Sequence, residues 1–317
     1  MATKIKVFSV DGSKLAKDIA LKLSIDFEDP YGDLKIDSFS DSEMSPQFME
    51  TIRGKRVFLV GSTNSPTNIL KMLLSVDAAM RASAKEIIAV IPYYGYGRQD
   101  RKEGPRGPIG AALMAKMLQA AGINRIMVVD FHADQIQGFF NLPVDHLSGH
   151  TLFLPQIISK LDKKLKYCIC SPDAGGVKRA MAYFKKLGSY DVTFALLDKR
   201  RKKPNEIETM TLIGDVKDRH VILVDDMIDT AGTLTKAATV LSESGALSVK
   251  AVAPHGILSG KAFKNIEECK ALTEIIISDS VSHESLPEKI SVLPLADLLA
   301  NAIKVVSKQR SLEQINS

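Results

Sequence analysis

Three aspartates and a glycine follow a short apolar run within eight residues, and these residue types together can bind a phosphorylated sugar. Residues 221–224 are all apolar and predict a short buried strand. Asp225 and Asp226 come next, and their carboxylates can accept hydrogen bonds from sugar hydroxyls or from metal-bound water. The loop at 229–233 then leads into a helix expected near Leu234, whose first N–H groups and positive dipole end favour a phosphate. A buried strand with an N-capped helix would explain the apolar run, but not three aspartates beside a glycine.

The loop residues have complementary uses. Gly232 lets the backbone come close to a phosphate because glycine has no Cβ. The hydroxyls of Thr230 and Thr233 add hydrogen-bond donors. The predicted sugar-phosphate site comprises Asp225, Asp226, Asp229, Thr230, Ala231, Gly232 and Thr233.

A basic segment, Arg98 to Lys102, could hold a nucleotide polyphosphate. It follows an apolar run that ends at Ile91 and an aromatic turn at 92–96. Two guanidinium groups and an ammonium group in five residues fit phosphate oxygens. A solvated charged turn is the usual alternative for such a run, and the spacing alone does not exclude it.

His132 and Asp173 each follow a predicted strand, and together they could hold a magnesium ion already bound to phosphates. Mg²⁺ usually takes only one or two protein ligands in such sites, so two side chains are enough to hold the ion. A lone histidine is more often structural, and the sequence alone leaves that alternative open.

Residues 199–203 are five consecutive basic residues. Such a run could bind nucleic acid or direct nuclear import. Because it follows a predicted strand and precedes Pro204, we expect a mobile cationic loop beside a phosphate site. Such a loop can close over a triphosphate and neutralise charge that develops in the transition state. If the chain did not also contain the acidic segment at 225–233, we would interpret residues 199–203 as an ordinary solvent-exposed charged surface.

A weaker signal lies at 39–43, where Phe39 precedes Asp41 and Glu43. The aromatic ring could stack on adenine, and the two acids could accept hydrogen bonds from its amino group.

The composition excludes several classes of protein. Apolar residues make up 45% and charged residues 25% of the 317 residues, which is ordinary for a globular protein and argues against disorder. The net charge of +5 suits anionic small molecules as well as nucleic acid. The start of the chain shows no secretory signal, and no apolar run approaches the roughly 20 residues that span a bilayer. Three cysteines without zinc spacing predict buried reduced thiols in the cytoplasm.

Strand-like runs alternate with helical patterns along the whole chain, which predicts an α/β fold with mainly parallel sheets covered on both faces. Strands are expected at 4–10, 57–60, 87–91, 125–129, 167–170, 192–196, 221–224, 249–253 and 274–277, and helices at 67–83, 109–121, 177–187, 234–244 and 295–308.

The two halves of the chain look alike, because residues 126–130 and 222–225 are both apolar runs that end in aspartate. We predict two related doubly wound domains, at 1–146 and 147–302, joined near Val144 to Leu152. A C-terminal helix at about 303–317 is expected to pack back on the first domain. Only the second half contains the Thr-Ala-Gly-Thr loop, so the sugar site is expected there.

The loop at 225–233 resembles the 5-phosphoribosyl-1-pyrophosphate (PRPP) binding loop of type I phosphoribosyltransferase-fold proteins. Six segments in order resemble the ribose-phosphate pyrophosphokinase family over essentially the whole chain. These segments lie at 39–43, 92–102, 132–140, 171–176, 198–201 and 225–233.

The resemblance implies two phosphoribosyltransferase-like domains, assembly into hexamers, and the reaction of ATP with ribose 5-phosphate to give AMP and PRPP. It implies that Lys199 and Arg201 stabilise the transition state, that His132 and Asp173 bind Mg²⁺, and that Arg201 joins the 225–233 loop in holding the sugar. The implied ATP-binding residues are Phe39, Asp41, Ser42 and Glu43, which reach ATP on a neighbouring subunit, and Arg98, Gln99, Asp100 and His132.

Three positions depart from the family pattern. Ser42 stands where glycine is usual, Gly97 where alanine is usual, and Gly107 where an acid is common. None of them removes a predicted catalytic group.

Four other functions share some of these features. A phosphoribosyltransferase that consumes PRPP would share the 225–233 loop but would not need the 98–102 segment. A non-catalytic regulatory homologue should have lost part of 198–201 or the His132–Asp173 pair, and neither is lost. A nucleic-acid binder built on 199–203 is the least favoured, so we expect small-molecule substrates and neither a nucleic-acid nor a membrane partner. A P-loop kinase is disfavoured because its Gly-x-x-x-x-Gly-Lys-Ser/Thr motif does not occur.

Overall fold

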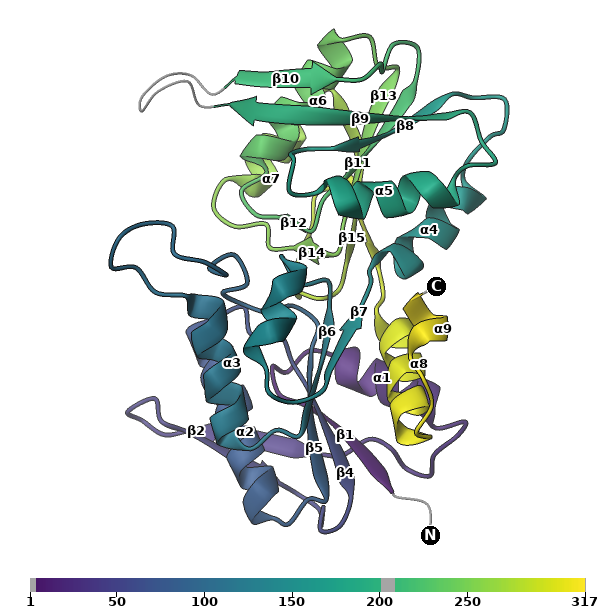
Figure 1. Cartoon of the computed structure of the whole chain (residues 1–317). Helices are drawn as coiled ribbons and strands as arrows, with labels where there is room; N and C mark the ends of the chain where they lie inside the picture. Colours follow the sequence, from purple (N-terminus) through teal and green to yellow (C-terminus); the bar gives the residue numbers. More distant parts are fainter. Residues whose placement is uncertain (1–3, 201–208, 317) are drawn as a thin grey trace. The chain divides into compact units, whose positions relative to one another are not determined.

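The computed structural model describes residues 4–200 and 209–316 and divides into two compact units (Figure 1). The first unit comprises Met1–Ser148 with Ser280–Ser282 and Pro294–Ser317, and the second comprises Gly149–Asp279 with His283–Leu293. Each unit has its own mainly parallel sheet between helices, so the predicted α/β fold is confirmed.

The first unit is built on a five-stranded parallel sheet in the order β1-β4-β5-β6-β7. Apolar side chains point to both faces, as expected for parallel strands covered on both sides. Helices α2 and α3 lie against one face and α1 and α8 against the other (Figure 1). The strands are β1 (Ile5–Ser9), β4 (Arg56–Val60), β5 (Glu86–Ile91), β6 (Arg125–Val129) and β7 (Val144–Leu147), and the helices are α1 (Leu15–Leu23), α2 (Pro66–Arg81), α3 (Gly110–Ala121) and α8 (Ala296–Ser307).

Local sequence explains where the helices of this unit begin and end. The Ser65 hydroxyl accepts a hydrogen bond from the Asn68 N–H at 3.1 Å, and Pro66 occupies the first turn of α2, where it is well tolerated. Helix α3 ends at Ala121 and is followed by Gly122, whose φ of 112° lies in the left-handed region that favours glycine. Helix α8 is tied to α1 by the ion pair between Lys22 and Asp297 at 2.8 Å.

A hairpin of β2 (Leu34–Ser38) and β3 (Met44–Phe48) forms a separate two-stranded antiparallel sheet in the first unit. Its inner side chains, including Phe48, pack against the core beside α2, and the Phe48 ring meets the Phe8 ring edge-on at 4.8 Å. The turn of this hairpin is the segment at 39–43.

The second unit is built on a seven-stranded sheet in the order β10-β9-β8-β11-β13-β15-β16, in which only the β9–β10 pair is antiparallel among the described residues. The strands are β8 (Tyr167–Ser171), β9 (Val192–Arg200), β10 (Thr209–Ile213), β11 (His220–Val224), β13 (Ser248–Ala253), β15 (Leu272–Ser278) and β16 (Ile290–Leu293).

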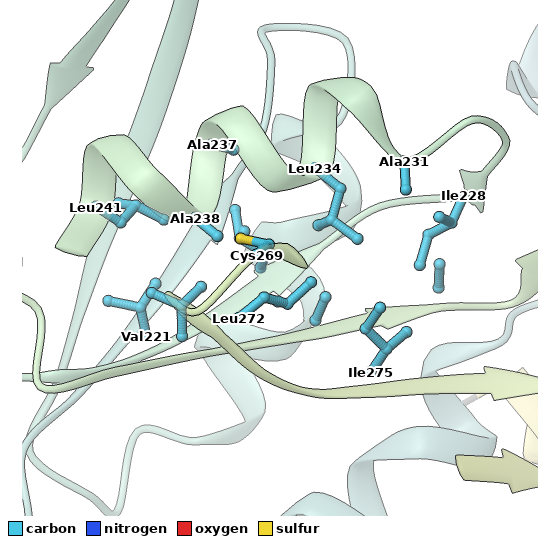
Figure 2. Close-up of a cluster of buried hydrophobic side chains, with 14 of the residues drawn as sticks. Val221, Ile228, Ala231, Leu234, Ala237, Ala238, Leu241, Cys269, Leu272 and Ile275 are labelled. Atoms are coloured by element: carbon cyan, nitrogen blue, oxygen red, sulfur yellow. The ribbon is translucent and has the colours of Figure 1, made fainter. Parts of the chain in front are cut away.

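Alternate residues of β11 belong to different cores of the second unit. Val221 and Leu223 pack with α6 (Gly232–Glu243) and α7 (Ala262–Glu268), in the cluster shown in Figure 2. Ile222 and Val224 pack with α4 (His150–Ser159) and α5 (Val177–Lys186). The apolar run at 221–224 is therefore a strand buried on both faces. The residues that follow it lie where the carboxyl ends of the parallel strands meet.

The segment expected to join the domains, 144–152, contains the position where the two units divide, between Ser148 and Gly149, with strand β7 before it and the start of α4 after it. One local prediction needs correction. Helix α6 begins at Gly232, two residues before the expected Leu234, so the glycine itself lies in the first turn. The three cysteines are free and buried, as predicted.

Candidate active site

The acidic segment after β11 lies at the carboxyl edge of the second unit's sheet. The Asp225 N–H donates to the Val252 carbonyl at 3.1 Å, and the Asp226 N–H donates to the Asp225 carboxylate at 2.8 Å. The short strands β12 (Met227–Ile228) and β14 (His255–Gly256) then pair in parallel. Open α/β sheets bind their ligands at this edge, so the two aspartates stand where a substrate is expected.

The start of α6 exposes backbone N–H groups. Ala231 has a φ of 60°, and its methyl group is buried in the cluster of Figure 2. Alanine carries no side-chain acceptor, so it cannot cap the helix, and the first N–H groups of α6 have no intrahelical partner. Gly232 and Thr233 are exposed, and a Cβ on Gly232 would meet, among the described residues, only Thr230 Oγ1 at 3.8 Å. An uncapped helix start with free space suits a phosphate.

Burial and a neighbouring carboxyl raise the pKa of Asp225. Desolvation is the largest cause, and the charge of Asp226 adds to it, while the guanidinium of Arg179 acts in the opposite direction. Arg179, on α5, lies with Nη1 3.7 Å from Asp226 Oδ1. Arg179 is not evident from the sequence, because it comes close to Asp226 only through the packing of α5 in the folded unit.

Asp173 follows β8, the strand next to β11, so it lies at the same edge of the second unit's sheet. Its Oδ1 accepts the Gly176 N–H at 2.9 Å, and its carbonyl accepts the Ser171 hydroxyl at 2.7 Å. The side chain is exposed. These contacts hold the turn at 173–176 in place, and the second carboxylate oxygen of Asp173 can still bind a ligand.

A cavity of about 390 Å³ in the first unit lies beside the predicted nucleotide segment. Its walls come from the turn at 63–66 with the start of α2, from the aromatic turn, and from the segment that follows it. The lining residues of the last two are Tyr93, Gly95, Tyr96, Arg98, Gln99 and Glu103. The Gln99 N–H donates to the Tyr96 carbonyl at 2.9 Å, and the Gln99 carbonyl accepts the Ala111 N–H at 3.1 Å. The polar walls and the Arg98 guanidinium favour a polyphosphate, while the carboxylate of Glu103 acts against one.

Two further residues that are predicted to bind the nucleotide, Asp100 and His132, lie in the same unit. Asp100 Oδ2 accepts a hydrogen bond from Gln135 Nε2 at 2.7 Å. His132 is exposed and follows β6, and a Cβ on Gly97 would lie 3.6 Å from the His132 Cβ. His146 was not predicted to have a role here, and its Nε2 accepts the Phe131 N–H at 3.1 Å, which holds the backbone next to His132. The structure therefore places His132 near the 97–99 segment.

The 39–43 segment is an exposed turn. The Ser42 N–H donates to the Phe39 carbonyl at 2.9 Å, and the Glu43 N–H donates to the Asp41 carboxylate at 3.1 Å. Ser42 has a φ of 73°, which explains why glycine suits this position. The Phe39 side chain is 61% exposed, so its ring is available to a partner outside the chain.

The two predicted transition-state residues are only partly described. The backbone of Lys199 lies near the end of β9, opposite Met210. Arg201 lies outside the described residues, as does most of the predicted cationic loop.

Within residues 4–200 and 209–316, no group of three or more His, Cys, Asp or Glu side chains could hold a metal ion. His132 belongs to the first unit and Asp173 to the second. A single carboxylate such as that of Asp173 fits Mg²⁺, which takes most of its remaining ligands from water and phosphate. In the part of the chain that the structure covers, no helix is both long and apolar enough to cross a membrane.

Comparisons with known proteins agree with these features. Residues 5–122 match the family described as the N-terminal domain of ribose phosphate pyrophosphokinase, and residues 191–316 match the phosphoribosyl synthetase-associated domain. The chain is 46% identical over 306 residues to a ribose-phosphate pyrophosphokinase of Porphyromonas gingivalis, covering 96% of each protein. It is 45% identical over 313 residues to one of Campylobacter jejuni, covering 98% of each. A crystal structure of phosphoribosylpyrophosphate synthetase from Mycobacterium smegmatis superposes with a TM-score of 0.87 at 35% identity, covering 97% of this chain and 100% of that one.

Proposed function

The chain belongs to the ribose-phosphate pyrophosphokinase family, and we propose from this premise that it transfers the β,γ-diphosphoryl group of ATP to ribose 5-phosphate. The products are AMP and PRPP, a precursor for nucleotide biosynthesis. One observation carries this proposal: Asp225 and Asp226 follow β11, and the start of α6 close behind them has no side-chain cap. The carboxylates suit the hydroxyls of a sugar, and the helix start suits its phosphate.

The sugar-phosphate half of the reaction is assigned to the second unit. The phosphate is bound by the N–H groups at the start of α6 and by the Thr230 and Thr233 hydroxyls, with Arg201 as a further cation. The sugar hydroxyls donate to the carboxylates of Asp225 and Asp226. This arrangement fixes the anomeric hydroxyl, whose oxygen attacks the β-phosphorus of ATP and releases its proton to solvent. The bond from that phosphorus to the α-phosphate oxygen breaks, and AMP leaves with that oxygen.

The nucleotide half is assigned to the cavity of the first unit. Arg98, Gln99, Asp100 and His132 bind the nucleotide from one subunit. The exposed turn of a second subunit supplies Phe39, Asp41, Ser42 and Glu43 to the adenine. The 61% exposure of Phe39 supports this arrangement, because a large ring on an exposed turn has area to bury against a partner. A shared site requires a homo-oligomer, which we propose to be a hexamer.

Little covalent chemistry falls to the side chains, so catalysis depends on positioning and on charge. We propose that His132 and Asp173 bind Mg²⁺, which neutralises charge on the phosphate oxygens when it is bound. Lys199 and Arg201 neutralise the charge that builds up on the transferring group and on AMP. The free, buried thiols of Cys168, Cys170 and Cys269 are consistent with the reducing cytoplasm, where we propose that the enzyme works.

The pH dependence of the reaction is predicted to respond to Arg179. Its guanidinium lowers the pKa of Asp225, so replacing Arg179 with methionine raises that pKa further. Asp225 must be ionised to accept hydrogen bonds from sugar hydroxyls. In the variant, the ionised form of Asp225 is therefore lost at a higher pH as the pH falls. We expect the acid limb of kcat/KM for ribose 5-phosphate to move to higher pH in Arg179→Met. Profiles of wild type and variant check this, and superimposable acid limbs would contradict it.

One assay separates this function from its alternatives. The protein is mixed either with ATP, Mg²⁺ and ribose 5-phosphate, or with PRPP, Mg²⁺ and a nucleobase. We expect turnover only in the first mixture. Release of pyrophosphate in the second would identify a PRPP-consuming phosphoribosyltransferase, and no turnover in either, with a folded oligomer, would identify a non-catalytic regulatory homologue.

A further inference from the structure

The segment Ile257–Asn265, called the support segment below, runs beside the sugar loop without belonging to any predicted site. The Ile257 and Leu258 N–H groups both donate to the Ile228 carbonyl, at 2.9 and 3.0 Å. The Ser259 N–H donates to the Asp229 carbonyl at 3.1 Å. These backbone bonds continue the β12–β14 pairing into the sugar loop, so the position of the loop depends on the support segment.

Two side chains of the support segment reach the loop itself. The Ser259 hydroxyl donates to the Asp229 carboxylate. The Asn265 amide, on α7, donates from Nδ2 to the Thr230 carbonyl at 2.9 Å. The two residues held in this way directly precede Ala231, the residue that turns the chain into α6.

Two residues that flank these contacts, Ala231 and Leu258, have a left-handed backbone conformation, which is unfavourable for residues other than glycine. Ala231 has a φ of 60° and Leu258 a φ of 54°, and both side chains are buried in the same core. Non-glycine residues keep such conformations only where the surrounding structure enforces them, and such positions concentrate at ligand clamps. Two buried apolar side chains and two polar side chains therefore hold this turn together.

We propose that Ser259 and Asn265 are positioning residues for ribose 5-phosphate, an inference that rests on the proposed function. They hold Asp229 and the Thr230 carbonyl so that the N–H groups at the start of α6 point toward the phosphate. They touch the loop rather than the substrate, so they affect binding of the sugar phosphate and leave binding of ATP unchanged.

Four variants of the full-length enzyme test this role. Asn265→Leu removes the donor at nearly constant size, and Lys264→Leu places the same side chain on the neighbouring residue of α7 as a control. Ser259→Ala removes the hydroxyl, and Ser259→Thr restores it. We expect Asn265→Leu and Ser259→Ala each to raise the KM for ribose 5-phosphate about tenfold, a typical effect of losing one such hydrogen bond. The KM for ATP stays within about twofold, and Lys264→Leu and Ser259→Thr stay near wild type.

Hydrogen exchange of the same variants gives a readout that does not need turnover. We expect faster exchange of amides at 229–235 in Asn265→Leu and Ser259→Ala, with unchanged exchange in β8 and β11. The inference is wrong if exchange in the loop is unchanged, or if the KM values for ATP and ribose 5-phosphate rise together. A wild-type protein that makes no PRPP, but whose loop loosens in these variants, would overturn the proposed function and leave the positioning role supported.

Discussion

Replacing Lys199 with alanine is expected to lower kcat for PRPP formation by on the order of 10²-fold or more. This magnitude is typical when one preorganised donor to a developing charge is removed. The KM values for both substrates change much less, because the ammonium group acts on charge that appears only in the transition state. Steady-state kinetics with ATP, Mg²⁺ and ribose 5-phosphate measures both quantities.

Lys202→Ala is the matched control, because it removes one positive charge from the same basic run outside the family motif at 198–201. A loss of kcat in Lys199→Ala alone would identify a specific donor. Equal losses in both variants would mean that the run acts only through its total charge. Near-normal turnover of Lys199→Ala would remove the assigned catalytic role.

The second large effect is expected from Gly232→Ala. A Cβ at this position has room in the folded chain, because its nearest neighbour among the described residues is Thr230 Oγ1 at 3.8 Å. Alanine is also the better residue in a helix, so the melting temperature should stay constant or rise. The added methyl group would occupy the space assigned to the phosphate and separate it from the N–H groups of α6. We expect the KM for ribose 5-phosphate to rise by on the order of 10²-fold, as for the loss of one or two charge-assisted hydrogen bonds.

Gly138→Ala is the control for this variant, because a Cβ there meets no described atom within 4 Å and the residue lies in the first unit. Its KM for ribose 5-phosphate should equal that of wild type. If Gly232→Ala also keeps the wild-type KM at unchanged stability, the phosphate does not bind at the start of α6.

The alternation of strands and helices could be predicted well because parallel strands buried on both faces are continuous apolar runs. Residues 221–224 and 126–129 are examples, and both are strands in the structure. The β2–β3 hairpin was missed, because its strands are only half-buried and Pro46 is unusual in a strand. Helix α4 was missed because Pro155 lies inside it.

The proposed sugar site involves contiguous residues, so that one strand end and one helix start place all of them, and its place in the fold could be predicted from the sequence. The residues that support it could not, because Arg179, Ser259 and Asn265 reach the loop through tertiary structure. The left-handed conformation of Ala231 also gives no sequence signal, since alanine ordinarily avoids positive φ. On α2, Leu70 and Met80 follow the helical period but are 47% and 49% exposed, because the core contacts a narrower stripe that includes Met72 and Val76.

ATP labelled at the β-phosphorus tests most directly whether the enzyme transfers a whole diphosphoryl group. The labelled nucleotide is incubated with the protein, Mg²⁺ and ribose 5-phosphate, and the products are separated. We expect the label in PRPP, unlabelled AMP in equal amount, and no reaction without the sugar. Label retained in ADP would mean transfer of the γ-phosphoryl group alone, which would contradict the proposed reaction.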